Sequence, residues 1–181
     1  LALPFGGDSE PVATINVMGS KETVLTAAYD TAATVVKLTQ LSQFQASVKI
    51  GGAESKIIKS GNLTIDNGLD GDQRCIGDGG VRSDIPEGTA KPSGDLSALF
   101  TDTTWLDKAK NMTKDSLELI YTKDLQSISF LFPEILWQLT SPTIPGKGGV
   151  LCDLKWQGFY DTDANASAAV VTLTNDVASY A

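Results

Sequence analysis

The chain contains no histidine. Histidine is the commonest general base and the commonest metal ligand in proteins, so Ser-His-Asp catalysis and histidine-containing zinc sites are excluded. Cysteine is also scarce. Only Cys75 and Cys152 occur, too few for a disulfide framework in a chain of this size, and both are expected to remain thiols. No run is long and apolar enough to cross a bilayer.

Complete cofactor and metal motifs are missing too. Residues 161–165 begin like a calcium-binding loop, but Ala166 and Thr172 stand where that loop needs Gly and Glu. Residues 77–80 begin like a dinucleotide fingerprint, but Arg82 replaces its third glycine. A phosphate-binding Walker A sequence does not occur. The sequence therefore predicts no cofactor, no metal and no enzymatic activity.

Charge of one sign predominates. Among 181 residues, 14 Lys and Arg face 22 Asp and Glu, for a net charge of −8. Because affinity for nucleic acid depends on Lys and Arg, tight nucleic-acid binding is not expected. A hydrophobic content of 41% is typical of a globular protein, and the length suits a single domain over residues 1–181. The chain begins with Leu1, which indicates a processed, trimmed or incomplete chain.

Alternation of apolar and polar residues predicts a mainly β protein. In residues 43–50, for example, Phe44, Ala46, Val48 and Ile50 share one face. Pro133 is expected to interrupt a strand. The predicted strands cover residues 43–50, 56–66, 116–122, 127–132, 135–139, 150–160 and 169–175, with Thr- and Val-rich strands at 12–18, 22–29 and 34–38. Residues 1–11 are predicted to form an extended N-terminal arm.

One short helix is expected over residues 104–112. Trp105, Leu106, Ala109 and Met112 share one helical face, and Thr104 with Asp107 resembles a capping box. Trp105 is expected to pack against a sheet. The predicted fold is therefore a β-sandwich or half-barrel with one flanking α-helix.

Residues 67–88 form a Gly- and Asp-rich break between two predicted strands. Loops longer than about 12–15 residues are usually functional or disordered. Asp66, Asp70, Asp72 and Asp78 are close enough in sequence to be considered as ligands for a hard cation. A solvated acidic loop is the favoured interpretation.

This loop and several segments after it resemble the tail tube proteins of long-tailed (siphovirus-type) bacteriophages. The resemblance runs from NGLDGDQRCIGDGGVRSDIPEG (67–88) through SGDLSALF (93–100) and the helical segment 104–112 to VVTLTNDVASY (170–180). It covers roughly residues 56–181. Residues before about Phe44 match nothing that we identify.

The resemblance implies a structural virion protein. Its fold would be a β-sandwich with a flanking helix, and subunits would form hexameric rings that stack into a hollow tail tube. DNA would pass through the bore without specific binding. Expected partners are copies of the chain itself and the tape measure, tail terminator and tail tip proteins, with no membrane. Assembly would take place in the bacterial host cytoplasm.

The resemblance also assigns roles to residues. The loop over residues 69–88 would carry the contact from one ring to the next and become ordered on assembly. Its contact residues would be Asp72, Arg74, Ile76, Asp78, Val81, Arg82, Asp84, Ile85 and Glu87. The polar faces of the predicted strands, and not the resemblance, supply candidates for the face of the bore, where an acidic wall would repel phosphates: Thr64, Asp66, Ser116 and Glu118.

An all-β binding module remains the alternative, such as a tail-associated carbohydrate-binding or adhesin domain. Its sugar platform would use the aromatic residues Trp105, Tyr121, Trp137, Trp156 and Tyr160. A row of exposed aromatic rings would favour this module. An open sheet edge and an acidic concave face would favour a tube subunit.

Overall fold

The computed structural model describes residues 1–7, 10–28, 40–77, 79–138, 150–162 and 165–175. In this part of the chain, nine strands form one antiparallel sheet, with one 3₁₀ turn, η1 (Gln43–Gln45), and one helix, α1 (Thr104–Lys110). The strands are β1 (Ala2–Gly6), β2 (Ala46–Ile50), β3 (Ala53–Glu54), β4 (Ile58–Asp66), β5 (Lys91–Leu99), β6 (Asp115–Lys123), β7 (Gln126–Gln138), β8 (Leu151–Phe159) and β9 (Val170–Thr174). The prediction of a mainly β fold with one flanking helix is confirmed.

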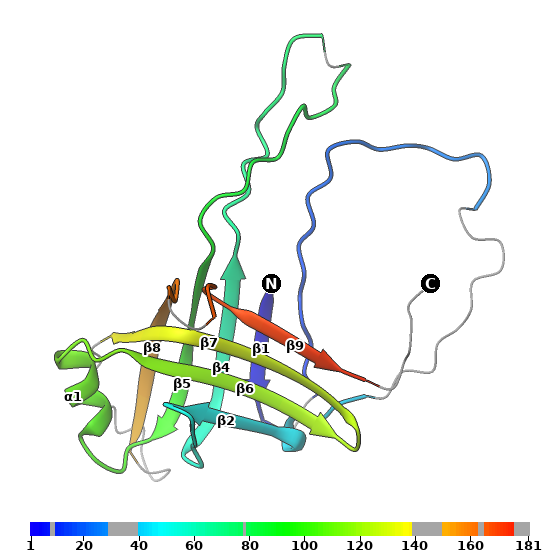
Figure 1. The fold of residues 1–181 in the computed structure, drawn as a ribbon. Helices are drawn as coiled ribbons and strands as arrows, with labels where there is room; N and C mark the ends of the chain where they lie inside the picture. The colour runs from blue at the N-terminus through cyan, green and yellow to red at the C-terminus, as the bar shows by residue number, and fades with distance from the viewer. Residues whose placement is uncertain (8–9, 29–39, 78, 139–149, 163–164, 176–181) are drawn as a thin grey trace.

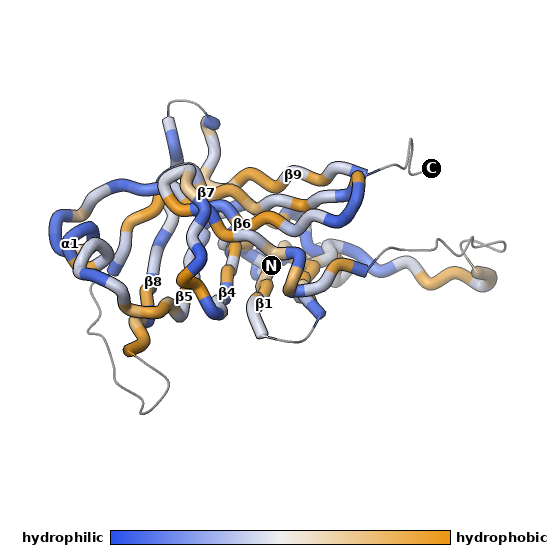
Figure 2. Tube along the Cα trace, turned by 90° about the horizontal axis from the view of Figure 1, so that it is seen from below, coloured by the Kyte–Doolittle hydropathy of each residue, from blue (hydrophilic) through white to orange (hydrophobic). Residues whose placement is uncertain are grey.

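The sheet folds over on itself into two layers. Its strand order is β1-β4-β5-β8-β7-β6-β2-β3, and β9 pairs with β7 beside this path. Strands β1, β4, β5 and β8 form one layer, and β2, β6, β7 and β9 cross over it at a steep angle (Figure 1). Seen from below, the two groups of strands lie one over the other (Figure 2).

Strand β7 joins the two layers. Along one edge it pairs with β6, while its other edge pairs first with β9, up to Leu131, and then with β8, from Glu134. Pro133 lies at this change of partner, in a bulge that adds one residue to β7 between Phe132 and Ile135. Proline is tolerated in a bulge because it has no N–H to donate. The prediction that Pro133 interrupts the strand is therefore wrong.

The core lies between the layers. The predicted inward faces of residues 116–122 and 150–160 are confirmed. Phe132 and Trp156 pack across the core with ring centroids 4.7 Å apart. The most deeply buried large side chains come from both layers: Leu63, Leu96, Leu119, Tyr121, Phe132, Ile135 and Trp156.

The segment 43–50 differs from the prediction at its start. It opens with η1 instead of a strand, so Phe44 is 82% exposed while Gln43 is buried. The Gln43 side chain is satisfied inside the protein, because its Oε1 accepts hydrogen bonds from Tyr121 Oη at 2.9 Å and Gly6 N at 3.0 Å. Only Val48 and Ile50 of the predicted apolar face are buried.

The N-terminal region also differs. Residues 2–6 of the expected arm form β1, which pairs with β4. The strands predicted at 12–18 and 22–29 are absent from the described residues. Thr14 makes one isolated bridge with Ala2, and Val12, Ile15, Val17 and Val24 are exposed. β-propensity alone does not make a strand where no neighbour offers a packing surface. The strand predicted at 34–38 lies outside the described residues.

Helix α1 packs against the edge of the sandwich. Trp105 meets Trp137 edge to face at 5.4 Å, which confirms its packing role. Thr103, not Thr104, bonds Asp107, at 3.1 Å. The Asp102 carboxylate accepts hydrogen bonds from the side chain and the backbone N–H of Thr104, and these two bonds lower the pKa of Asp102.

The end of the helix differs from the expectation. Met112 lies beyond α1 with φ 49° and is exposed, so its predicted place on the apolar helical face is wrong. Among the described residues, no helix has the length and apolar character that a membrane crossing needs.

Candidate functional site

The loop between β4 and β5 projects away from the sandwich as an irregular hairpin (Figure 1). We call residues 67–90 the hairpin. Its limbs are held together by sparse backbone hydrogen bonds: Gly88 N to Asn67 O, Asp70 N to Pro86 O and Ser83 N to Gln73 O, each 3.1 Å. Gly68, with φ 58°, turns the chain out of β4 and approaches Gly88 closely, which a side chain at Gly88 would prevent.

Arg82 ties the hairpin to the N-terminal loop, residues 10–28. Its guanidinium donates through Nε to Gly71 O at 2.6 Å and through Nη1 to Gly19 O at 2.7 Å. Its backbone N–H donates to Ser20 O at 3.1 Å. Met18 packs against Gly71, since a Cβ added to Gly71 would lie only 2.6 Å from Met18 Sδ. The hairpin and the N-terminal loop are therefore joined at a point midway along the hairpin.

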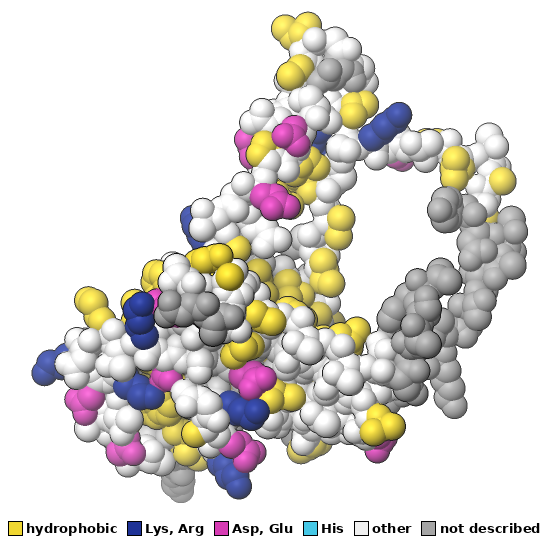
Figure 3. Space-filling view, viewed as in Figure 1, with side chains coloured by type: hydrophobic (Ala, Val, Ile, Leu, Met, Phe, Trp, Pro, Cys, Tyr) yellow, Lys and Arg dark blue, Asp and Glu magenta, His cyan; other side chains and the backbone are white. Residues whose placement is uncertain are grey.

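The contact residues predicted for the loop differ in their surroundings. Ile76 near the tip is fully exposed. Val81, Arg82 and Ile85 are half-buried within the hairpin, and Asp78 lies outside the described residues. The remaining contact residues, Asp72, Arg74, Asp84 and Glu87, are exposed. Hydrophobic side chains gather at the hairpin tip and acidic ones along its stalk (Figure 3).

The acidic residues of the hairpin are spread along it. Asp70 accepts from Asp72 N at 3.0 Å and Gln73 Nε2 at 2.6 Å, and these bonds lower the pKa of Asp70. Asp66 accepts from Gly68 N at 2.9 Å. Across the described residues, no three Asp, Glu, Cys or His side chains gather as a metal site would require. The carboxylates of Asp66 and Asp70 therefore stabilise local turns.

The two cysteines lie far apart in the fold. Cys75 is exposed on the hairpin and Cys152 is buried in β8, and no disulfide joins them. The Cys75 thiol lies 3.5 Å from the Ser83 hydroxyl on the opposite limb.

The four candidates for the bore fall on opposite faces of the sandwich. Leu63 of β4 and Leu117 of β6 both point into the core, so their polar neighbours point outward from different layers. Thr64 and Asp66 lie on the outer face of the β4 layer, and Ser116 and Glu118 on that of the β6 layer. Glu118 pairs there with Lys49 at 3.2 Å. A single bore-facing surface cannot contain all four.

The outer face of β4, β5 and β8 is made of small polar and charged side chains. We call it the polar face. In register, Asn62 lies beside Asp95 and Asp95 beside Lys155, while Thr64 lies beside Ser93. Asp95, Asp153 and Lys155 are exposed. Sequence reasoning did not propose the β5 and β8 residues for the bore, although their alternation with buried neighbours marks them as outward-facing.

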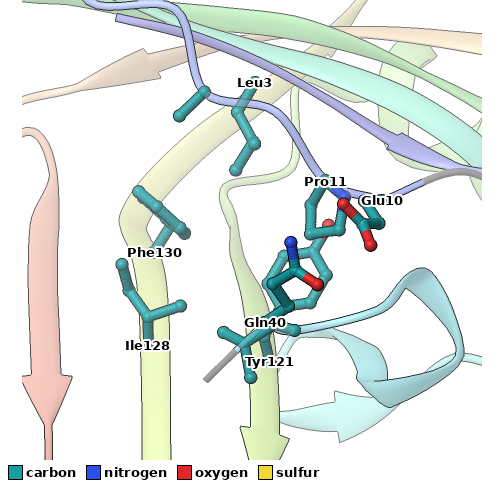
Figure 4. A pocket seen from close by; sticks show the side chains of 9 residues that line it. Leu3, Glu10, Pro11, Gln40, Tyr121, Ile128 and Phe130 are labelled. Carbon is teal, nitrogen blue, oxygen red and sulfur yellow. The ribbon is translucent and has the colours of Figure 1, made fainter. Parts of the chain in front are cut away.

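A pocket of about 360 Å³ opens between the layers beside β1 (Figure 4). Leu3 faces Ile128 and Phe130 across it, Tyr121 lies at its base, and Pro11 and Glu10 lie at its rim. Burial raises the pKa of Tyr121 to about 12. Among the described residues that line the pocket, Glu10 is the one carboxylate.

The layers stay apart at this edge. In β9, Val171 lies opposite Phe130 and Leu173 opposite Ile128, on the face that points inward, yet both β9 side chains are exposed.

The five aromatic residues considered for a sugar platform do not form an exposed row. Tyr121, Trp137 and Trp156 are buried, Trp105 is half-buried, and only Tyr160 of the five is exposed.

The sequence model of one protein family, described as "Phage tail tube protein", matches residues 1–158 of the chain. A search among curated proteins finds no match. The family match and the resemblance of individual segments agree over residues 56–158. The match also includes the residues before Phe44, which the segments did not reach, and it ends before β9.

Proposed function

Because the chain belongs to the phage tail tube protein family and is therefore a structural component of the virion tail, we propose that it forms hexameric rings that stack into the tube through which DNA is delivered. Its direct partners in this proposal are neighbouring copies of itself. The tape measure, terminator and tip proteins meet the stack inside and at its ends. Assembly takes place in the host cytoplasm.

The hairpin is the observation that supports this assembly best. It leaves one end of the sandwich, is held by only a few hydrogen bonds between its limbs, and exposes Ile76 fully. An isolated protein gains little from ordering such a segment, since the backbone entropy is about 1–2 kcal/mol per residue. A contact with the next ring offsets that cost. Of the contact residues proposed from the sequence, the exposed ones keep this role: Asp72, Arg74, Ile76, Asp84 and Glu87.

Ring formation is supported by the open edges of the sandwich. Within the described part of the chain, no strand pairs with the edge of β9 away from β7, and the exposed Val171 and Leu173 of β9 adjoin the pocket beside β1. Closing a ring through such an edge covers apolar area and satisfies strand hydrogen-bonding groups, which exposed edges otherwise leave open to aggregation.

We assign the polar face to the bore. It keeps Thr64 and Asp66 among the lumen candidates and leaves Ser116 and Glu118 outside. Its carboxylates, Asp66, Asp95 and Asp153, outnumber its lysines, Lys91 and Lys155. Small side chains leave space for a wide bore, and an excess of carboxylates repels DNA phosphates.

Electron microscopy of the purified protein tests the assembly. The wild-type chain is expected to form tubes at high concentration. Deletion of residues 72–85 leaves the Gly88–Asn67 hydrogen bond to close the shortened loop, and circular dichroism checks that the sheet is retained. This variant is expected to stop at rings or subunits. Full-length tubes from the deleted chain would overturn the role of the hairpin.

Charge reversal tests the bore assignment. Asp95→Lys with Asp153→Lys adds positive charge to the polar face of every subunit and is expected to slow DNA release from assembled tails, less so at high salt. Glu118→Lys is the matched control on the opposite face. A slower release with Glu118→Lys, and not with the other pair, would place the β6 layer at the bore.

A further inference from the structure

A second pocket, of about 330 Å³, lies at the end of the sandwich opposite the hairpin. We call it the distal pocket. Its apolar wall comes from Phe5, Val48 and Ile58, and Gln43 also lines it. Lys56 and Lys59 stand at its rim, both exposed, beside Glu54.

The strand directions fix the position of the distal pocket. Strand β4 runs from Ile58, at the pocket, to Asp66, where the hairpin begins. Strand β1 is antiparallel to β4, with Gly6 opposite Ser60, so its pocket-lining residues lie at the same end. Figure 1 shows the hairpin rising from the other end of β4. A second copy stacked in the same orientation presents its distal pocket towards the hairpin tip.

The two ends carry complementary charge. The described part of the hairpin holds the carboxylates of Asp70, Asp72, Asp84 and Glu87 against two arginines, and the guanidinium of Arg82 is already bound to backbone carbonyls. At the distal pocket, neither Lys56 nor Lys59 has an ion-pair partner within the described residues. The mostly acidic stalk of the hairpin therefore faces a pocket rim on which two lysines outnumber Glu54.

We propose that the distal pocket receives the hairpin tip of the next copy in the stack, with Ile76 against its apolar wall and Asp72 and Asp84 facing Lys56 and Lys59. This inference rests on the proposed function, because it requires copies stacked head to tail. Such a contact uses two different surfaces of each subunit, so it repeats without closing and extends the stack. The carboxylates select the partner surface by charge.

Two other pockets fit this role less well. A cleft of about 460 Å³ lies between residues 16–18 and the end of β4, at the base of the hairpin itself. A neighbour stacked in the same orientation cannot reach that cleft with its tip. The pocket beside β1 opens between the layers, and its described lining has Glu10 but no lysine or arginine, so it offers nothing to attract the carboxylates of the hairpin.

Charge reversal tests the pairing. Lys56→Glu with Lys59→Glu is expected to abolish tube growth while leaving shorter assemblies. Adding Asp72→Lys and Asp84→Lys to the same chain is expected to restore tubes. Lys110→Glu, which reverses an exposed lysine on α1, is the matched control and should leave tube length unchanged. Tubes of normal length from the Lys56 and Lys59 variant would overturn the docking.

Cross-linking provides a measurement that does not depend on weakened assembly. In a Cys75→Ser background, Ile76→Cys with Ser55→Cys, which lines the distal pocket, is expected to give a ladder of linked subunits when oxidised. Ile76→Cys with Asn16→Cys, in the cleft at the hairpin base, should give no ladder. A ladder from the second pair alone would overturn the docking. If the wild-type chain forms no tubes at all, the proposed function fails instead.

Discussion

Arg82 donates a hydrogen bond through Nη1 to the carbonyl oxygen of Gly19, 63 residues earlier in the chain, at 2.7 Å. This bond links two loops that the sheet alone would leave independent. Together with the bonds to Gly71 O and Ser20 O, it holds the middle of the hairpin against the N-terminal loop.

Replacing Arg82 with lysine is expected to free the hairpin from the N-terminal loop. Lysine has one point charge in place of a planar fork and cannot reach both carbonyls. We expect about fivefold faster amide exchange at residue 82, from a loss of about 1 kcal/mol, with little change in the global unfolding free energy. Arg74→Lys on the same hairpin is the control. Equal exchange in the two variants would contradict the link.

The buried bond between Tyr121 and Gln43 predicts unequal costs for its two partners. Tyr121→Phe removes one donor and is expected to cost about 1 kcal/mol of unfolding free energy. Gln43→Met leaves both the Tyr121 hydroxyl and the Gly6 N–H without their hydrogen-bond acceptor, and is expected to cost about 1–3 kcal/mol more. Denaturant unfolding measures both. Equal costs would show that the Gln43 acceptor is not shared.

Alkaline pH is expected to weaken the fold through Tyr121. Its folded-state pKa is raised by burial to about 12, above the ordinary value of 10.0. The neutral phenol is thus favoured in the folded state, so this contribution is complete below pH 10 and is lost as the pH rises to about 12. The Tyr121→Phe variant should lose less stability over this window than wild type does. Tyr160→Phe is the control and should follow the wild type.

Gly94→Ala is expected to destabilise the β4 layer strongly. A Cβ at Gly94 would overlap the backbone oxygen of Asn62 and meet the Trp156 ring at 2.9 Å. Because a strand backbone cannot yield like a flexible side chain, we expect a loss of about 3 kcal/mol in denaturant unfolding. Gly19→Ala is the control, since nothing lies within 4 Å of its Cβ position. A loss below about 1 kcal/mol would mean that β4 and β5 can separate locally.

Strands whose two faces differ sharply were predictable from the sequence. In residues 151–159, every second residue is buried, and the alternation of Leu154 and Trp156 with Asp153 and Lys155 reports that directly. The same holds for Leu117, Leu119 and Tyr121 in β6. Period two is a local property of a strand that has one buried face, so a short window of sequence records it.

Other features depend on partners distant in sequence. Pro133 stays within β7 because a bulge opposite Asp115 and Leu117 accommodates it. Phe44 is exposed because Gln43 takes the inward position to bond Tyr121, 78 residues later. Val12 and Val17 have strand propensity but no layer to cover them. None of these pairings leaves a periodic signal in the local sequence.

The candidate site, too, was predictable from the sequence only in part. The hairpin was recognisable from its length and its Gly and Asp content, whereas its attachment through Arg82 was not, since the acceptors are backbone carbonyls. The four lumen candidates share polar strand positions, but their separation onto two outer faces follows from how the sheet folds over. Only the strand order reveals that.

The strand carrying the hairpin also determines how the protein bears force. A pull on the hairpin is transmitted along β4 and β5, whose outer neighbours β1 and β8 are bonded to them side by side. The load therefore acts in shear, and many backbone hydrogen bonds must break together instead of one after another. A stack linked by such hairpins would resist stretching along its axis far better than the few bonds within each hairpin suggest.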